Sequence, residues 1–265
     1  MLIYTIYHVM IQTDVFYTTA FLFHKIILGG FEIMADKISG GAELGHPVLN
    51  GRAAKHIVCF GDSNTHGYCA ETGGRFDETE RWTRLLQDKL GDSFLITEEG
   101  LGGRTTSFDD PIHESMSGLE YIHPCLMSHK PVDLLIIMLG TNDTKERFGS
   151  SAACIALGLK RLINKAKAAN EAWKDGKPNI LVIAPKNIDK RYEETVVVQT
   201  MGYGCAEKSA LVPEEFRKMA EQMGCAFLDA NTVVTEQNHV DFMHLTKEGH
   251  RELAEALAVL IPGLS

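Results

Sequence analysis

From residue 55 onward, short apolar runs alternate with longer segments in which apolar residues recur every three or four positions. The short runs are typical of strands buried on both faces of a parallel sheet, and the longer segments are typical of amphipathic helices. The predicted strands are 57–60, 94–97, 133–139, 179–184 and 226–228, and the predicted helices are 79–91, 118–129, 151–173, 213–223 and 246–260. This alternation predicts an α/β fold: a three-layer, doubly wound, five-stranded parallel sheet with helices on both faces.

Two residues mark the ends of the first predicted helix. Thr79 is its predicted N-cap, and Gly91 is the predicted stop at its C-terminal end.

The first fifty residues differ from the rest of the chain. Residues 1–31 are apolar and aromatic but lack the basic segment and the cleavage site of a secretory signal. Polar residues also interrupt this segment, so that no apolar stretch in it approaches the roughly 20 residues that a membrane-spanning helix needs. We predict that residues 1–33 are an N-terminal extension outside the fold, with Met34 as the effective start, that 34–54 are a leader, and that 55–265 form a single domain. An oligomer-docking arm and a membrane tether are alternatives for the extension.

Composition narrows the choice of partners. The 265 residues are 45% hydrophobic and 23% charged, which suits one soluble domain with a sizeable core. A formal net charge of −9, without a basic cluster, argues against nucleic acid or an anionic membrane as the main partner. Six cysteines without Cys-x-x-Cys spacing predict buried thiols in a reducing compartment, not disulfides or zinc ligands. We therefore expect a cytoplasmic protein.

A candidate nucleophile follows the first predicted strand. Gly61-Asp62-Ser63 comes directly after the apolar run, and ligands of open α/β sheets bind beyond the carboxyl ends of such strands. By itself the motif fits better with capping residues that begin a helix. A serine becomes a nucleophile when a histidine takes its proton and a carboxylate orients that histidine.

The sequence offers residues for each of these roles. His244 is the candidate base, and Asp241, three residues earlier, is the candidate carboxylate. Read alone, this segment could be a surface loop, or His239, Asp241 and His244 could be metal ligands, although no further ligand cluster accompanies them. Gly103 and Asn142, which each follow a strand, could donate hydrogen bonds to an oxyanion from the backbone and from the side chain.

Taken together, these segments resemble the ordered signature blocks of the GDSL-type, or SGNH, hydrolases. The blocks are Gly61-Asp62-Ser63, Gly103, Gly140-Thr141-Asn142-Asp143 and Asp241-x-x-His244. The strings around 98–106, 109–111 and 139–145 are similar to the bacterial arylesterase and acyltransferase branch of that superfamily. The resemblance spans roughly residues 55–262. The sequence departs from the eponymous pattern at Asn64, where leucine is usual, which leaves the substrate preference open.

The resemblance implies the SGNH hydrolase fold and a role for each matching residue. Ser63 would be the nucleophile, His244 the general base and acid, and Asp241 its orienting partner. The backbone N–H groups of Ser63 and Gly103 and the side chain of Asn142 would form the oxyanion hole. The resemblance implies no metal and no organic cofactor, and Gly100-Leu101-Gly102-Gly103 lacks the spacing of a dinucleotide loop.

The expected function is that of a cytoplasmic serine esterase acting on small short-chain acyl or aryl esters, with acyl transfer to alcohols as a further reaction. The alternatives are a carbohydrate O-deacetylase of the same fold and a flavodoxin-like phosphate- or flavin-binding module without catalysis, which p-nitrophenyl acetate hydrolysis would distinguish. The long segment 185–208 carries an apolar patch at 196–203, and the resemblance implies that it walls the acyl pocket and docks on neighbouring subunits of a homo-oligomer. A purely solvated surface loop is the alternative for this segment.

Overall fold

The computed structural model describes residues 45–264. The predicted extension at 1–33 and the leader up to residue 44 lie outside the described residues. The remainder of the leader forms two short antiparallel strands, β1 (Val48–Leu49) and β2 (Arg52–Ala53). In the turn between them, Nδ2 of Asn50 donates a hydrogen bond of 2.9 Å to Oδ1 of Asp92, which ties this hairpin to the main domain.

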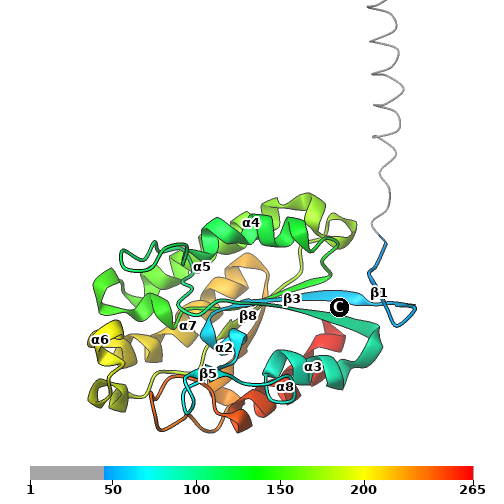
Figure 1. Ribbon diagram of the computed structural model, residues 1–265. Coiled ribbons are helices and arrows are strands. Elements are labelled where there is room, and N and C mark those ends of the chain that lie inside the picture. The colour runs from blue at the N-terminus through cyan, green and yellow to red at the C-terminus, as the bar shows by residue number, and fades with distance from the viewer. Residues whose placement is uncertain (1–44, 265) are drawn as a thin grey trace, which may run out of the picture. The chain divides into compact units, whose positions relative to one another are not determined.

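A five-stranded sheet lies at the centre of the domain (Figure 1). Every strand in it runs parallel to its neighbours, in the order β6-β3-β7-β8-β9. The strands are β3 (Lys55–Gly61), β6 (Phe94–Gly100), β7 (Leu134–Met138), β8 (Ile180–Ala184) and β9 (Ala226–Asp229). The strand order reverses between β3 and β7, which makes the carboxyl edge of that pair the expected ligand site.

Helices cover both faces of the sheet because its strands are apolar on both faces. On β3, Val58 and Phe60 point into one core and Ile57 and Cys59 into the other. Helices α4 (Gly118–Ser128), α5 (Ala152–Ala168) and α7 (Cys205–Met223) close the first core, and α3 (Trp82–Leu90) and α8 (Lys247–Leu260) close the second (Figure 1). The predicted α/β doubly wound fold is confirmed.

Three predicted helix boundaries are wrong. The first helix begins at Trp82, because the carboxylate of Asp77 accepts hydrogen bonds from the N–H and hydroxyl of Thr79 and holds that residue in a preceding turn. Helix α5 ends at Ala168, and short 3₁₀ turns continue to Gly176. Helix α7 starts eight residues before the predicted position and contains Pro213 in its interior, because its first turns bury apolar side chains of their own.

The remaining elements are short and lie in the connections. They are α2 (Ser63–His66), the strands β4 (Tyr68–Cys69) and β5 (Gly74–Arg75), a 3₁₀ helix (Lys190–Glu194) and α6 (Val198–Met201). The last two belong to the long segment 185–208. Within the described part of the chain, no helix combines the length and the hydropathy needed to cross a lipid bilayer.

The cysteines are all free thiols. Most are buried or half-buried, but Cys154 is exposed, so the prediction of buried thiols is wrong at that position. Cys154 lies in the first turn of α5, on the side that faces away from the core residues of the helix.

Candidate active site

The turn between β3 and α2 holds Ser63 at the carboxyl edge of the sheet. Gly61 ends the strand, and a Cβ atom there would overlap the side chain of Thr65 in α2, so only glycine allows the helix to start this close to the strand. Asp62 caps α2 by accepting a hydrogen bond of 3.0 Å from the N–H of Asn64. Ser63 is therefore the first helical residue, at the positive end of a short helix.

Ser63 is the first member of a chain of hydrogen bonds. Its Oγ lies 2.8 Å from Nε2 of His244, and Nδ1 of the same ring lies 2.6 Å from Oδ2 of Asp241. Phe242, between the two loop residues, has a φ of 60°, and this left-handed turn brings the carboxylate back to the ring. These are the distances expected of a nucleophile, a base and the group that orients the base.

Asn238 holds the loop that carries Asp241. Its Oδ1 accepts hydrogen bonds of 2.8 Å from the N–H groups of Val240 and Asp241, and its Nδ2 donates one of 2.7 Å to Oδ1 of Asp241. Burial raises the pKa of Asp241, but the hydrogen bonds from His244 and Asn238 outweigh burial and lower this pKa to about 2. Asp241 is thus a carboxylate at neutral pH.

Asn64 links the nucleophile turn to the histidine loop. Its Oδ1 accepts a hydrogen bond of 2.9 Å from the N–H of Leu245, the residue after His244. Its main-chain oxygen accepts another, of 3.1 Å, from Nε1 of Trp82. Asn64 is buried and is not among the residues that line the cavity at Ser63. The departure from the usual leucine therefore stabilises the loop instead of shaping the substrate pocket.

The two further oxyanion-hole candidates lie beside Ser63. Gly103 has a φ of 86°, which side chains rarely allow. Nδ2 of Asn142 donates a hydrogen bond of 3.2 Å to the main-chain oxygen of Arg104, which fixes the orientation of the amide. The five site residues predicted from the sequence all line one cavity of about 420 Å³, and they are Ser63, Gly103, Asn142, Asp241 and His244.

Comparisons with known proteins agree with this geometry. The sequence pattern of the GDSL-like Lipase/Acylhydrolase family matches residues 59–252. The chain belongs to this family. As a member of the GDSL, or SGNH, family it is a carboxylic ester hydrolase. No curated protein sequence matches the chain.

Solved structures resemble this SGNH hydrolase over most of its length. An aryl esterase of M. smegmatis is 35% identical, with a TM-score of 0.74 over 80% of this chain and 100% of its own. Est24, a carbohydrate acetylesterase from Sinorhizobium meliloti, is 34% identical, with a TM-score of 0.71 over 80% of this chain and 100% of its own.

Arg104 supports the loop that carries Gly103 in this SGNH hydrolase, and the sequence alone does not single it out. Its Nη1 donates hydrogen bonds to the main-chain oxygens of Gly61, at 2.9 Å, and Glu99. The guanidinium carbon lies 4.3 Å from the centre of the Phe60 ring. One side chain thus joins the ends of β3 and β6 to the loop that contains Gly103. In the sequence, only the string Arg104-Thr105-Thr106, which is part of the family resemblance, pointed to this residue.

Two buried carboxyl groups lie beneath the site. Burial raises the pKa of Asp62 to about 6 and that of Asp143 to about 7. Asp143 accepts hydrogen bonds from the N–H and the hydroxyl of Thr106, at 2.9 and 2.5 Å from Oδ1. This contact fastens the residue after Asn142 to the loop after Gly103. Oδ2 of Asp62 has no hydrogen-bond partner among residues 45–264.

Two cations face the cavity from its far wall. Lys145 and Arg147 both line it, and both bind Oδ2 of Asp110, at 3.2 and 2.6 Å. Burial raises the pKa of Asp110, but its hydrogen bonds, of which the one from Arg147 has the largest effect, hold this pKa well below its usual range. One carboxylate therefore neutralises one of two positive charges.

A metal ion has little support in the described residues. Glu99, Cys125 and His129 bring potential ligand atoms within 4.8 Å of one another, but Nε2 of His129 already bonds Oε1 of Glu99 at 2.6 Å. Burial also raises the pKa of the Cys125 thiol to about 12, which disfavours the thiolate that a metal needs. The alternative in which His244 binds a metal conflicts with the hydrogen bonds at both of its ring nitrogens.

Proposed function

We propose that this SGNH hydrolase is a serine esterase that cleaves small short-chain acyl or aryl esters through an acyl-enzyme on Ser63. The observation that carries the proposal is the continuous chain from Oγ of Ser63 through the His244 ring to Asp241, with distances of 2.8 and 2.6 Å. A serine without such a base is a weak nucleophile.

In the first half of the reaction, Oγ of Ser63 attacks the ester carbonyl while Nε2 of His244 takes its proton. The ionised Asp241 accepts a hydrogen bond from Nδ1–H of His244 and stabilises the imidazolium that forms. The carbonyl oxygen becomes an oxyanion, which accepts hydrogen bonds from the N–H groups of Ser63 and Gly103 and from the Asn142 amide. His244 then gives its proton to the departing alkoxide or phenolate, and the acyl group stays on Ser63.

In the second half, water attacks the acyl-serine with His244 again as the base. The same oxyanion donors stabilise the second tetrahedral intermediate, and release of the acid restores Ser63. An alcohol in place of water would take the acyl group by the same steps, which is the acyl transfer expected from the sequence.

The size of the cavity supports a small substrate. Its volume of about 420 Å³ lies near the lower end of the roughly 300–1,000 Å³ of small-molecule sites. Val197, Thr200 and Met201 line it from the long segment 185–208. Their presence supports the expectation that this segment walls the acyl pocket.

The same segment supports assembly into a homo-oligomer. Val196 is 78% exposed and Tyr203 is 61% exposed, next to the residues that line the cavity. Apolar side chains that are exposed close together are a feature of surfaces that meet another protein. Light scattering tests the assembly, and a monomeric molar mass would contradict it.

Deacetylation of a carbohydrate is the second candidate function. It is favoured by the 34% identity with Est24, a carbohydrate acetylesterase, over 80% of this chain. The two functions share one mechanism and differ in the leaving group.

The decisive experiment measures kcat/KM for p-nitrophenyl esters of increasing chain length and for acetylated sugars. We expect the highest value for acetate or butyrate and labelling of Ser63 by a fluorophosphonate probe. Labelling of a different residue, or the absence of hydrolysis with every ester, would overturn the proposal.

A further inference from the structure

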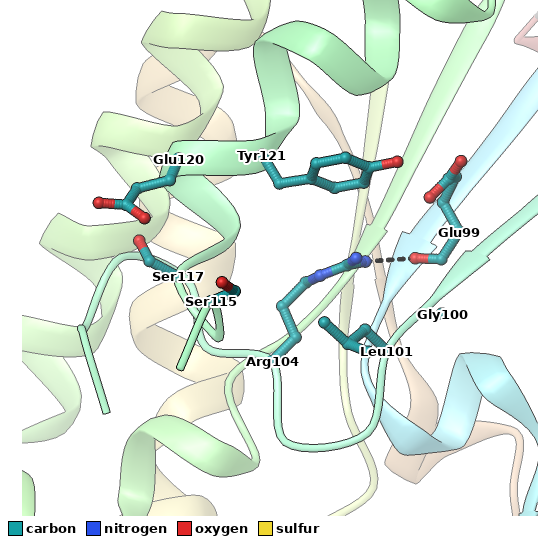
Figure 2. A pocket seen from close by; sticks show the side chains of 8 residues that line it. All are labelled: Glu99, Gly100, Leu101, Arg104, Ser115, Ser117, Glu120 and Tyr121. Atoms are coloured by element: carbon teal, nitrogen blue, oxygen red, sulfur yellow. Dashed lines mark hydrogen bonds between the residues drawn. The ribbon is translucent and has the colours of Figure 1, made fainter. Parts of the chain in front are cut away.

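A second cavity lies next to the catalytic pocket and has no part in the proposed reaction. It has a volume of about 480 Å³, and the residues that line it include Glu99, Leu101, Arg104, Ser115, Ser117, Glu120 and Tyr121 (Figure 2). The two cavities share a wall. In the loop after β6, Leu101 and Arg104 line the second cavity while Gly102 and Gly103 line the catalytic pocket. Before α4, Ser115 and Ser117 line the second cavity while Met116 lines the catalytic pocket.

Two polar groups in this second cavity have no hydrogen-bond partner among residues 45–264. Arg104 uses Nη1 for main-chain oxygens, while its Nε is buried and has no hydrogen-bond partner. Ser117 precedes α4, but its hydroxyl makes no capping hydrogen bond. Both residues are only 3% exposed. Buried polar groups are normally paired, and leaving one unpaired is costly, so the unpaired Nε indicates a ligand that brings an oxygen atom.

The charges in the second cavity disfavour an ionic ligand. The Arg104 guanidinium lies between two carboxylates, with Glu99 on one side and Glu120 on the other (Figure 2). An anion would face both carboxylates, and a cation would face the guanidinium. A neutral ligand with several hydroxyl groups avoids both conflicts, because hydroxyls donate to carboxylates and accept from a guanidinium.

One side of the second cavity is apolar. The ring of Tyr121 is 40% exposed and lies over the guanidinium of Arg104, whose carbon is 5.3 Å from the ring centre. Leu101 is 37% exposed on the opposite side of Arg104 from Tyr121 (Figure 2). Such a ring gives a flat surface for the C–H face of a ligand while polar groups bind its edges.

We propose that the second cavity binds a neutral sugar ring. The C–H face of the sugar packs on Tyr121, ring hydroxyls accept hydrogen bonds from Nε of Arg104 and Oγ of Ser117, and another hydroxyl donates to Glu120. The sugar is either free or part of an acylated saccharide whose ester group reaches over the wall to Ser63. This site goes beyond the proposed esterase reaction, in which none of its side chains contacts the reacting atoms and only Arg104 has a supporting role.

The binding test uses saturation-transfer NMR with D-xylose and D-glucose on the Ser63→Ala variant of the full chain. Because that variant needs no turnover, the result is independent of the esterase proposal. We expect both sugars to bind with a Kd on the order of millimolar, as ligands of this size do. Tyr121→Ala and Ser117→Ala in the same background should each weaken binding at least about tenfold, since each removes one of the contacts.

Leu211→Ala is the matched control, because it truncates another exposed apolar side chain, on α7, and should leave binding unchanged. Ser117→Ala removes a hydroxyl without a described partner, so folding should not suffer. No saturation transfer from either sugar, or transfer that survives both variants, would overturn the proposal. Tighter binding of glucuronate or glucosamine than of D-glucose would overturn the charge argument on which the choice of a neutral sugar rests.

A kinetic test distinguishes the two sources of the sugar. It compares the kcat/KM of p-nitrophenyl acetate with that of a mono-O-acetylated xyloside in the wild type and in Tyr121→Ala. If the sugar belongs to the ester, the kcat/KM of Tyr121→Ala should fall about tenfold for the acetylated xyloside and stay unchanged for p-nitrophenyl acetate. If the sugar is free, both esters should keep their kcat/KM while D-xylose binding is lost. Either result supports a sugar site in the second cavity.

Discussion

The catalytic pocket and the second cavity lie on two sides of one wall, yet they differ in whether their polar groups have hydrogen-bond partners. In the catalytic pocket, Ser63, His244 and Asp241 each have a partner within 2.8 Å, and Asn238 holds the end of the chain. In the second cavity, Nε of Arg104 has no partner among the described residues, and Oγ of Ser117 makes no capping hydrogen bond.

This difference separates chemistry from binding. Groups that stabilise a transition state gain from being fixed before the substrate arrives, because no reorganisation is then needed during the reaction. Groups that bind a ligand must instead keep donors and acceptors free for it. Arg104 belongs to both sides, since Nη1 and its main-chain oxygen support the loop of Gly103 and the amide of Asn142 while its Nε has no acceptor among the described residues. Substitutions on the two sides of the wall should therefore differ sharply in their effect on hydrolysis.

The largest effect is expected for Ser63→Ala. Without the nucleophile no acyl-enzyme forms, and kcat should fall by a factor on the order of 10⁶. The variant should also lose labelling by a fluorophosphonate, measured by mass spectrometry. Ser117→Ala is the matched control across the wall and should keep both labelling and activity on p-nitrophenyl acetate, which carries no sugar. Labelling that survives in Ser63→Ala would show that the acyl group goes elsewhere.

Asp241→Asn should come next, with a fall in kcat of about 10⁴. An amide at this position can donate to Nδ1 of His244 and stabilise the wrong tautomer of the ring, while the fold is kept. Asp189→Asn is the control, since the Asp189 carboxylate pairs with Arg191 at the surface. Near wild-type turnover in Asp241→Asn would mean that another carboxylate orients the histidine.

Asn142→Ala should lower kcat by about 10²–10³, because it removes one of the three oxyanion donors. KM should change far less, since the donor acts mainly in the transition state. Steady-state kinetics with p-nitrophenyl acetate measure both constants. A raised KM with unchanged kcat would instead assign Asn142 to ground-state binding.

The sequence predicted the strands well, and it also indicated which residues lie together at the sheet edge, because both depend on local patterns. Apolar runs of three to seven residues identified the five strands of the sheet, and the position of Ser63, Gly103 and Asn142 just after strands put them on one edge. That Ser63, Gly103, Asn142, Asp241 and His244 line one cavity follows from the topology. Their catalytic roles stay predictions, as does the cytoplasmic location.

The sequence could not predict contacts between distant segments. The hydrogen bond from Leu245 to Asn64 joins residues 181 positions apart, so nothing local marks Asn64 as a support of the histidine loop. Helix α7 begins at Cys205 because tertiary burial outweighs the usual preference for proline at a helix start. The second cavity also depends on three-dimensional contact, since it forms between the loop after β6 and the start of α4.

A smaller effect, on stability, is expected for Asp143→Asn. Burial raises the folded-state pKa of Asp143 to about 7, above its unfolded value. Between about pH 4 and pH 7 the folded protein therefore holds a proton that the unfolded chain has lost, and stability falls as pH rises through this window. The free energy of unfolding of the wild type should drop by on the order of 2 kcal/mol more between pH 5 and pH 8 than that of Asp143→Asn. Urea unfolding at both pH values measures this difference, and equal pH slopes would show that Asp143 is ionised in the folded protein.

The smallest effect is expected for Glu120→Gln, on the far side of the wall. Glu120 is exposed in the first turn of α4 and does not line the catalytic pocket, so the substitution removes one charge without touching the hydrogen bonds of Ser63, His244 or Asp241. Exposed charges are screened by water and salt, and kcat/KM for p-nitrophenyl acetate should stay within about twofold of the wild type. A tenfold change would mean that the wall transmits the state of the second cavity to the oxyanion loop. Arg104 is the residue that the two sides share. Such a change should therefore disappear in an Arg104→Lys background, where the two hydrogen bonds from Nη1 to the main-chain oxygens of Gly61 and Glu99 are lost.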